Sequence, residues 1–259
     1  MRVMDLAIIL DGWPHDERDE VNNIRKIVGI DGRVKLQIRL RDGVIQWELE
    51  GRPDGRRPYG FESVLAYCRV LLERSPQPRR RLDKSMLDEL EAELLAVTKR
   101  RLVLLKIGDY SRGLKDAVHA LGVLQILRKC ARDKEAAFQS DRYRPLITAD
   151  KARAEALLEV QREQMQGAIQ ALNNGIHEIE EFFQLYGIES QISKSQERQA
   201  LVDLRRSLRE RYSIPLTDDE LLETLKAEQQ VAIEQEDFEM AARLRDKINL
   251  LLEKLGKTV

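Results

Sequence analysis

The sequence predicts a mainly helical protein of the α+β class, with a small antiparallel β-meander at its N-terminus and an antiparallel helical hairpin at its C-terminus. Charged residues make up 34% of the 259 residues and aromatic residues only 5%, which is typical of long solvated helices rather than of a β-sandwich. Apolar residues recur at helical spacing through most of the chain after residue 60. We therefore predict a β-rich head at residues 1–60, a helical body at 61–215 and a closing hairpin at 216–259.

The head contains two stretches in which polar and apolar residues alternate. Residues 33–40 and 44–50 both follow this pattern, which predicts strands with one buried face. Asp42-Gly43 between them is a strong signal for a hairpin turn. Residues 24–30, which precede another turn signal, are expected to add a third strand. A three-stranded meander needs a cover to be stable, and we expect the helices that follow it to supply that cover.

A loop rich in turn residues, at positions 51–60, carries three arginines. One interpretation is an anion-binding loop, in which Arg52, Arg56 and Arg57 hold a phosphate or an acidic partner. The alternative is a connector whose prolines and glycines set the backbone angles and whose arginines are solvated. The sequence leaves both interpretations open.

The body is predicted to be helical from the spacing of its apolar residues. The expected helices cover residues 61–74, 82–107, 114–131, 149–186 and 193–211. Prolines within residues 75–78 end the first of them, because proline cannot continue a helix. The Asn-Asn-Gly stretch at 173–175 is expected to kink the fourth helix or divide it into a hairpin. Residues 213–215 are the expected hinge before the closing hairpin.

A turn inside the body resembles the turn of the closing hairpin. Asp109 and Tyr110 occupy the places that Asp237 and Phe238 occupy 128 positions later. The similarity suggests a diverged internal copy, and independent use of the same turn chemistry is the alternative.

The charges of the body and the tail differ in sign. Residues 97–144 contain 12 Lys and Arg against 5 Asp and Glu, whereas residues 217–259 contain 6 against 11. The tail could dock on the basic middle, or the basic middle could meet an outside acidic partner such as nucleic acid. Because we expect no interleaved exposed aromatic residues in the basic segment, and it has no recognised nucleic-acid motif, docking within the molecule or between copies is favoured.

The first helix of the closing hairpin begins with a capping signal. Thr217 and Glu220 form an S/T-x-x-E capping box, in which two backbone N–H groups at the helix start are satisfied reciprocally. Leu222, Leu225 and Ala232 follow at helical spacing and mark the seam of this helix.

The second helix begins after Asp237, a good N-cap residue. A spacing of three and four residues marks its seam, which comprises Phe238, Ala241, Ile248, Leu252 and Leu255, with Arg245 at the remaining position. Because Ala241 and Ala242 are small, the first helix is expected to approach closely there. The apolar residues outside the seam need a cover from the body or from a second hairpin; they are Val231, Ile233, Leu244 and Leu251.

These residues carry a resemblance to a known family. Glu236-Asp237-Phe238-Glu239, then Ala241-Ala242, Leu244-Arg245-Asp246 and Ile248, resemble the UVR motif, the helical hairpin of the excinuclease proteins UvrB and UvrC, of McsA and of ClpC-type unfoldases. The resemblance implies a module that pairs with another protein, often hairpin against hairpin. It implies a partner-binding set of Glu236, Asp237, Phe238, Glu239, Ala241, Ala242, Arg245, Asp246 and Ile248.

The chain departs from the larger proteins that carry this motif. It lacks the Gly-Lys-Ser/Thr phosphate-binding loop of UvrB. It also lacks the paired CxxC motifs of McsA, since its two cysteines are Cys68 and Cys130. The chain is therefore similar to stand-alone UvrB/UvrC motif-containing proteins.

The sequence contains no motif for a catalytic, cofactor or metal site. The three histidines, His15, His119 and His177, lie far apart in the sequence. We therefore expect no enzymatic activity, no cofactor and no metal. Two distant cysteines favour a reducing compartment, and the apolar stretch at residues 4–10 is too short for a signal peptide or a membrane span. We expect a cytoplasmic protein.

The favoured hypothesis is an adaptor that binds a protein with a similar hairpin, or another copy of itself, through the closing hairpin. One alternative is an accessory DNA-repair factor that binds nucleic acid through the basic middle and the excinuclease through the tail. Another is a sensor of phosphate or another anion that uses the arginines of the loop at 52–57.

Overall fold

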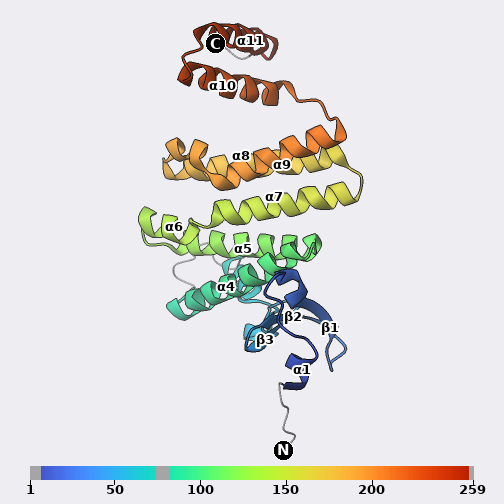
Figure 1. Cartoon of the computed structure of the whole chain (residues 1–259). Helices are drawn as coiled ribbons and strands as arrows, with labels where there is room; N and C mark the ends of the chain where they lie inside the picture. The colour runs from blue at the N-terminus through green and yellow to red at the C-terminus, as the bar shows by residue number, and fades with distance from the viewer. Residues whose placement is uncertain (1–6, 74–81, 257–259) are drawn as a thin grey trace, which may run out of the picture. The chain divides into compact units, whose positions relative to one another are not determined.

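The computed structural model describes residues 7–73 and 82–256 and divides them into two compact units. The division falls between Leu204 and Arg205, within helix α9 (Gln196–Tyr212). The first unit contains the sheet and most of the helices, and the second contains the end of α9 and the closing hairpin (Figure 1). The mainly helical class with a small N-terminal sheet is confirmed, and the predicted three-part division of the chain stays a prediction.

The sheet is the predicted antiparallel meander. Its strands are β1 (Ile24–Val28), β2 (Val34–Leu40) and β3 (Gly43–Glu48), in the order β1-β2-β3. Leu36 of β2 lies opposite Trp47 of β3, and Lys26 of β1 lies opposite Leu36 on the other side. The turn between β2 and β3 falls at the Asp-Gly signal, as expected.

Helix α4 (Lys84–Lys106) supplies the cover that the sheet needs. Leu36 and Leu49 are buried together with Leu104 of α4 in one apolar cluster. The opposite face of β2 is also largely buried, where a strand with a single buried face was expected. On that face Lys35 forms ion pairs with Asp31 and Glu48, so charged partners take the place of solvent.

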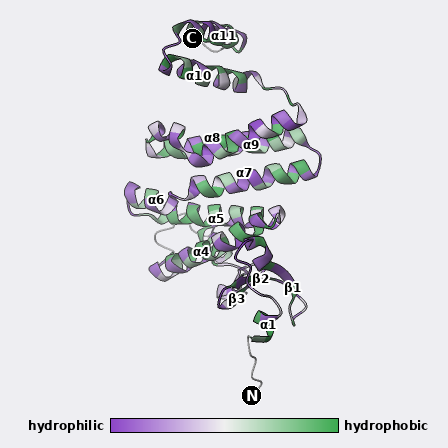
Figure 2. Ribbon diagram, in the orientation of Figure 1, coloured by the Kyte–Doolittle hydropathy of each residue, from purple (hydrophilic) through white to green (hydrophobic). Residues whose placement is uncertain are grey.

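The helices of the first unit form a stack, which Figure 1 shows as successive layers. The described helices of the first unit are α1 (Ala7–Asp11), which lies apart from this stack, α2 (Val64–Glu73), α4, α5 (Tyr110–Cys130), α6 (Lys134–Asp141), α7 (Arg144–Gln161), α8 (Met165–Tyr186) and the first part of α9, with short 3-10 turns at Glu20–Asn23, Pro58–Gly60 and Glu189–Lys194. Figure 2 shows hydrophobic and hydrophilic residues mixed along each helix, as amphipathic helices require. The predicted helix end at 75–78 lies outside the described residues.

The expected long helix at 149–186 is two helices, and the predicted position of its break is wrong. The chain reverses at Glu163, which adopts φ +61°, and not at residues 173–175. Gly175 lies inside α8, where a Cβ atom would come within 2.3 Å of Ala152 Cβ and 3.0 Å of Leu201 Cδ1. The glycine therefore permits close packing of helices rather than a turn.

The core of the stack contains charges as well as aliphatic side chains. Arg100 of α4 pairs with Asp116 of α5 at 2.6 Å, and Arg101 of α4 pairs with Asp150 of α7 at 3.0 Å. Arg101 is fully buried. Burial lowers the pKa of Arg101 and raises the pKa of Asp150, and their mutual attraction opposes both effects.

The second unit is built on helices α10 (Asp218–Glu234) and α11 (Phe238–Lys254), which pack against each other as the predicted hairpin. Thr217 and Glu220 form the predicted capping box at the start of α10. Arg209, near the end of α9, forms an ion pair with Glu220 and joins that helix end to the hairpin within the same unit.

Candidate protein-binding hairpin and polar pocket

The turn of the hairpin holds the first three residues of the predicted partner-binding set. Glu236 adopts φ +59° and is exposed, and Asp237 caps α11 by accepting a 3.0 Å hydrogen bond from the N–H of Met240. Phe238, the first residue of α11, has 69% of its surface exposed. A phenylalanine so exposed beside a rigid cap is available to a partner.

The other residues of the set divide between the seam and the surface of α11. Ala241 and Ile248 are buried against α10, at 8% and 6% exposure, and Ala242 is half-buried. The exposed members are Glu239, which forms a 2.6 Å ion pair with Arg243, and Arg245 and Asp246, which pair with each other at 2.9 Å. The structure thus brings the nine residues onto one helix and its cap, but it does not place them all on one face.

The seam of α11 differs from the predicted one. Leu244 and Leu251, expected on the outer face, are 5% and 8% exposed and pack in the cluster that contains Leu222 and Leu225 of α10. Phe238, expected in the seam, is outside it. Two rows of residues with steps of three and four were possible seams on α11. The predicted row contains Arg245, whose burial would carry a large desolvation cost, whereas the observed row has Leu244 and Leu251 instead.

Large apolar residues remain exposed on both helices of the hairpin. Besides Phe238, these residues are Leu221, Val231, Ile233, Met240 and Leu250, at 37% to 71% exposure. The exposure of Val231 and Ile233 was expected. The hairpin therefore completes its own core and still leaves apolar surface uncovered.

The start of α10 is held by an electrostatic cluster. Burial alone would raise the pKa of Glu220, but hydrogen bonds from Arg209 and from the amide and hydroxyl of Thr217 lower it to about 2. Arg205 lies 3.5 Å from the other carboxylate oxygen of Glu220. The carboxylate fixes the direction of the hairpin's first helix by joining the cap to α9.

In the first unit, Glu93 of α4 is a buried hub that the sequence analysis missed. Its fully buried carboxylate accepts hydrogen bonds from the N–H groups of Val64 and Leu65, from Arg52 at 2.9 Å and from His119 at 2.8 Å. Burial opposes ionisation, but the bonds from His119 and the two amides outweigh it and hold the pKa of Glu93 below its usual range. One feature of the sequence could have indicated the burial of this glutamate. Glu93 follows Leu90 by three residues and therefore lies on the apolar side of the predicted helix.

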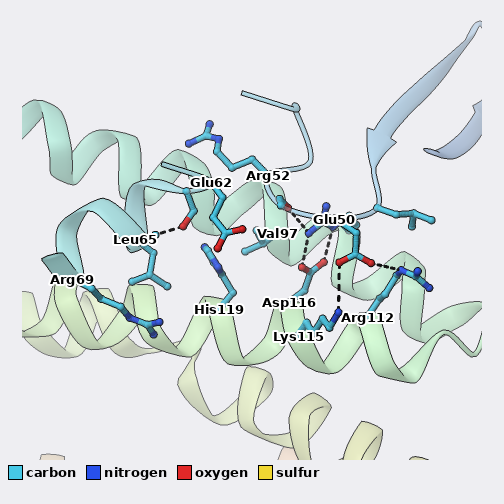
Figure 3. A pocket seen from close by; sticks show the side chains of 15 residues that line it. Glu50, Arg52, Glu62, Leu65, Arg69, Val97, Arg112, Lys115, Asp116 and His119 are labelled. Atoms are coloured by element: carbon cyan, nitrogen blue, oxygen red, sulfur yellow. Dashed lines mark hydrogen bonds and ion pairs between the residues drawn. The ribbon is translucent and has the colours of Figure 1, made fainter. Parts of the chain in front are cut away.

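Beside this hub lies a polar cavity of about 260 Å³. Its walls come from the loop at 49–52, the start of α2, and helices α4 and α5 (Figure 3). Arg112 pairs with Glu50 at 2.9 Å, and Lys115 lies 3.5 Å from the same carboxylate. Acidic and basic groups thus alternate along the cavity, and most of its charge is balanced within the protein.

The three arginines predicted to bind an anion, Arg52, Arg56 and Arg57, line one cavity, and anion binding there stays a prediction. The guanidinium of Arg52 is held by Asp54 at 2.8 Å and by Glu93, which leaves it little capacity for an outside anion. Arg56 and Arg57 are exposed. The shared cavity has a volume of about 260 Å³ and is also lined by Arg33 and by three glutamates, Glu48, Glu50 and Glu62. This arrangement matches a structured loop whose charges are largely compensated.

The basic segment at 97–144 is also compensated within the first unit. Eight of its 12 Lys and Arg side chains form ion pairs with Asp or Glu; these are Arg100, Arg101, Lys106, Arg112, Lys115, Arg128, Arg132 and Arg144. A net positive charge counted along the sequence therefore does not become an open basic surface of the same size.

Among the described residues, no group of three or more His, Cys, Asp and Glu side chains is placed to hold a metal ion. The helices in the part of the chain that the structure describes include none that is long and apolar enough to cross a membrane.

The comparisons with known proteins concern the hairpin. The model of the UvrB/uvrC motif matches residues 219–254, which cover nearly all of α10 and α11. No curated protein and no solved structure matches the chain.

Proposed function

Because residues 219–254 are a UVR motif, we propose that the protein is a non-enzymatic adaptor that binds another protein through the hairpin α10–α11. The observation that carries this proposal is the 69% exposure of Phe238 at the tip of a hairpin that already has a core of its own. An aromatic residue that a packed module leaves exposed is available to a partner, and aromatic residues often dominate the binding energy.

The rest of the hairpin supports the same proposal. Its capping box and its buried leucines hold the two helices together without help from a partner, so the exposed residues are presented on a rigid frame. A rigid frame loses little conformational entropy on binding, which favours affinity. We include a cytoplasmic location in the proposal, on the basis of the two cysteines in 259 residues.

Crosslinking and affinity capture in the native cell test the proposal, with the full-length protein and its Phe238→Ala variant as baits. We expect the variant to lose at least about tenfold in affinity for the captured protein, the equivalent of about 1.4 kcal/mol. Leu95→Ala is the matched control, because Leu95 is an apolar residue of α4 with 56% exposure.

The outcome that counts against an adaptor is equal capture by the full-length protein, the Phe238→Ala variant and a chain that ends at residue 215. Light scattering of the same three proteins reports whether the partner is another copy of the chain.

A further inference from the structure

Three helical hairpins of this chain share one turn geometry. The turns are residues 107–109 between α4 and α5, 162–164 between α7 and α8, and 235–237 between α10 and α11. In each turn the first residue has φ near −90° and ψ near 0°, and the second is left-handed, with φ of +75°, +61° and +59°. The third residue has ψ of 65°, 71° and 76°, and its N–H donates to the carbonyl five residues earlier at 2.8 to 2.9 Å.

Because the turns are alike, positions on the helices that follow them, α5, α8 and α11, can be aligned. We number each position from the last turn residue, which is Asp109, Gln164 or Asp237. Eight and fifteen residues after Asp109 are Ala117 and Leu124, and the same steps after Gln164 reach Leu172 and Ile179. All four are fully buried. They lie on one side of their helix, because a step of seven residues is close to two full turns.

A later helix of the chain packs against each of these two hairpins near these positions. Ile147 of α7 packs in the same cluster as Ala117 and Leu124 of α5. On α8, Leu201 of α9 approaches Gly175, where a Cβ atom would be 3.0 Å from Leu201 Cδ1. Each of these two hairpins therefore receives an aliphatic side chain from a later helix, α7 in the first case and α9 in the second.

Within the second unit, no described helix covers the same line on α11. The steps after Asp237 reach Arg245 and Leu252, and the first residue of the line is Phe238. The Arg245 side chain is 62% exposed, Leu252 is half-buried and Phe238 is 69% exposed. The residues equivalent to Phe238, which are Tyr110 and Met165, are half-buried in their hairpins.

The stack also shows how a hairpin of this kind accommodates an arginine under its covering helix. Arg101 stands on α4, is fully buried and meets the carboxylate of Asp150 from the covering helix α7 at 3.0 Å. Arg245 pairs with its neighbour Asp246, and both side chains are exposed. A helix laid over Arg245 would bury a charge, and an unpaired buried charge costs several kcal/mol.

We propose that α11 is covered by a helix of a partner protein that places an aspartate or glutamate opposite Arg245, with apolar residues on either side facing Phe238 and Leu252. The inference rests on the proposed function and specifies the chemistry of the partner. A second copy of this chain is the wrong occupant for this line. Phe238 and Leu252 are equally far from Arg245 along the sequence. An antiparallel copy of α11 that pairs Phe238 with Leu252 would therefore place arginine against arginine, and a parallel copy in register would do the same.

A charge swap supplies a probe with the required chemistry. The full-length Arg245→Glu variant carries apolar residues at 238 and 252 around a carboxylate, so its α11 has the properties inferred for the partner helix. We expect a mixture of the wild-type protein and this variant to associate at least tenfold more tightly than either protein alone, as measured by analytical ultracentrifugation. The control is Arg243→Glu, the same charge change at an exposed position of α11 outside the line, which should give no gain.

A mixture that associates no more tightly than its components overturns the inference, as does an equal gain with Arg243→Glu. Circular dichroism of both variants verifies that the hairpin stays folded, which we expect because both side chains are exposed.

Capture from the native cell separates this inference from the proposed function. Loss of capture with Phe238→Ala but not with Arg245→Glu would preserve the adaptor and overturn the inferred carboxylate. Unchanged capture with Phe238→Ala would overturn the adaptor itself.

Discussion

The hairpins α4–α5 and α10–α11 have the same turn but are stabilised in different ways. The first buries a glutamate and two arginines, and each has a partner outside the hairpin: Glu93 meets Arg52, Arg100 donates to the carbonyl of Glu48, and Arg101 pairs with Asp150. The second buries leucines and alanines in its seam and keeps its charges at the surface, apart from Glu220 at its start. The comparison indicates that α4–α5 is an integrated part of a larger core, whereas the apolar core of α10–α11 comes from its own two helices.

The largest effect that this comparison predicts is at Glu93. Removal of a buried carboxylate that satisfies two amides, an arginine and a histidine leaves several buried donors without a partner, so Glu93→Ala should lower the free energy of unfolding by about 3–5 kcal/mol. Urea denaturation of the full-length protein, followed by circular dichroism, measures this. Glu91→Ala, at an exposed neighbouring position, should change the stability by less than about 0.5 kcal/mol. Equal free energies of unfolding for the two variants would contradict the stabilising role of the Glu93 carboxylate.

The next effect separates the core of the second hairpin from its surface. Leu244→Ala opens a cavity in the seam and should cost about 2–4 kcal/mol, whereas Phe238→Ala should cost less than about 0.5 kcal/mol. Thermal unfolding compares the two variants, with attention to the transition of the second unit. A larger loss for Phe238→Ala would mean that the phenylalanine is a core residue, as the spacing in the sequence suggested.

A smaller effect is expected at Gly175, where the covering helix meets the hairpin α7–α8. A methyl group there would collide with Ala152 and press on Leu201, and such overpacking typically costs about 1–3 kcal/mol. Denaturation of Gly175→Ala measures the loss. Because alanine is otherwise the better helix former, a gain in stability would show that the glycine is not needed for helix contact.

The smallest expected effect is a pH dependence of the second hairpin. The folded-state pKa of Glu220 is about 2, below the ordinary value of 4.5, so its contribution is complete above the ordinary pKa and is lost as the pH falls toward 2. The melting temperature of the hairpin should therefore decrease between pH 4.5 and pH 2. The slope should be shallower in Glu220→Gln, and identical slopes would argue against the ionised cap.

Local patterns in the sequence were sufficient for the elements that depend on neighbouring residues. The Asp-Gly turn predicted the β2–β3 hairpin, and the pair of Thr217 and Glu220 predicted the start of α10. The turn at Asp109 was matched to the turn at Asp237, and the structure gives both the same backbone geometry. Each of these features is determined within four or five residues, which is the range that a pattern can cover.

The features that the sequence analysis missed depend on partners far along the chain. Glu93 meets Arg52 and His119, and nothing in the spacing of those three residues indicates that they converge. On α11, two apolar rows shared Ala241 and Ile248, and the choice between them depended on which row α10 would accept. The predicted break at 173–175 failed for a related reason, because a glycine that permits close packing has the same sequence signature as one that permits a turn.

Photo-crosslinking from position 238 tests the adaptor function most directly. The full-length protein would carry a photoreactive phenylalanine analogue in place of Phe238 in the native cell, and a second version would carry it in place of Leu95. We predict a dominant protein adduct from position 238 that is absent from position 95. No adduct from position 238, or the same adducts from both positions, would contradict a partner bound at the tip of the hairpin.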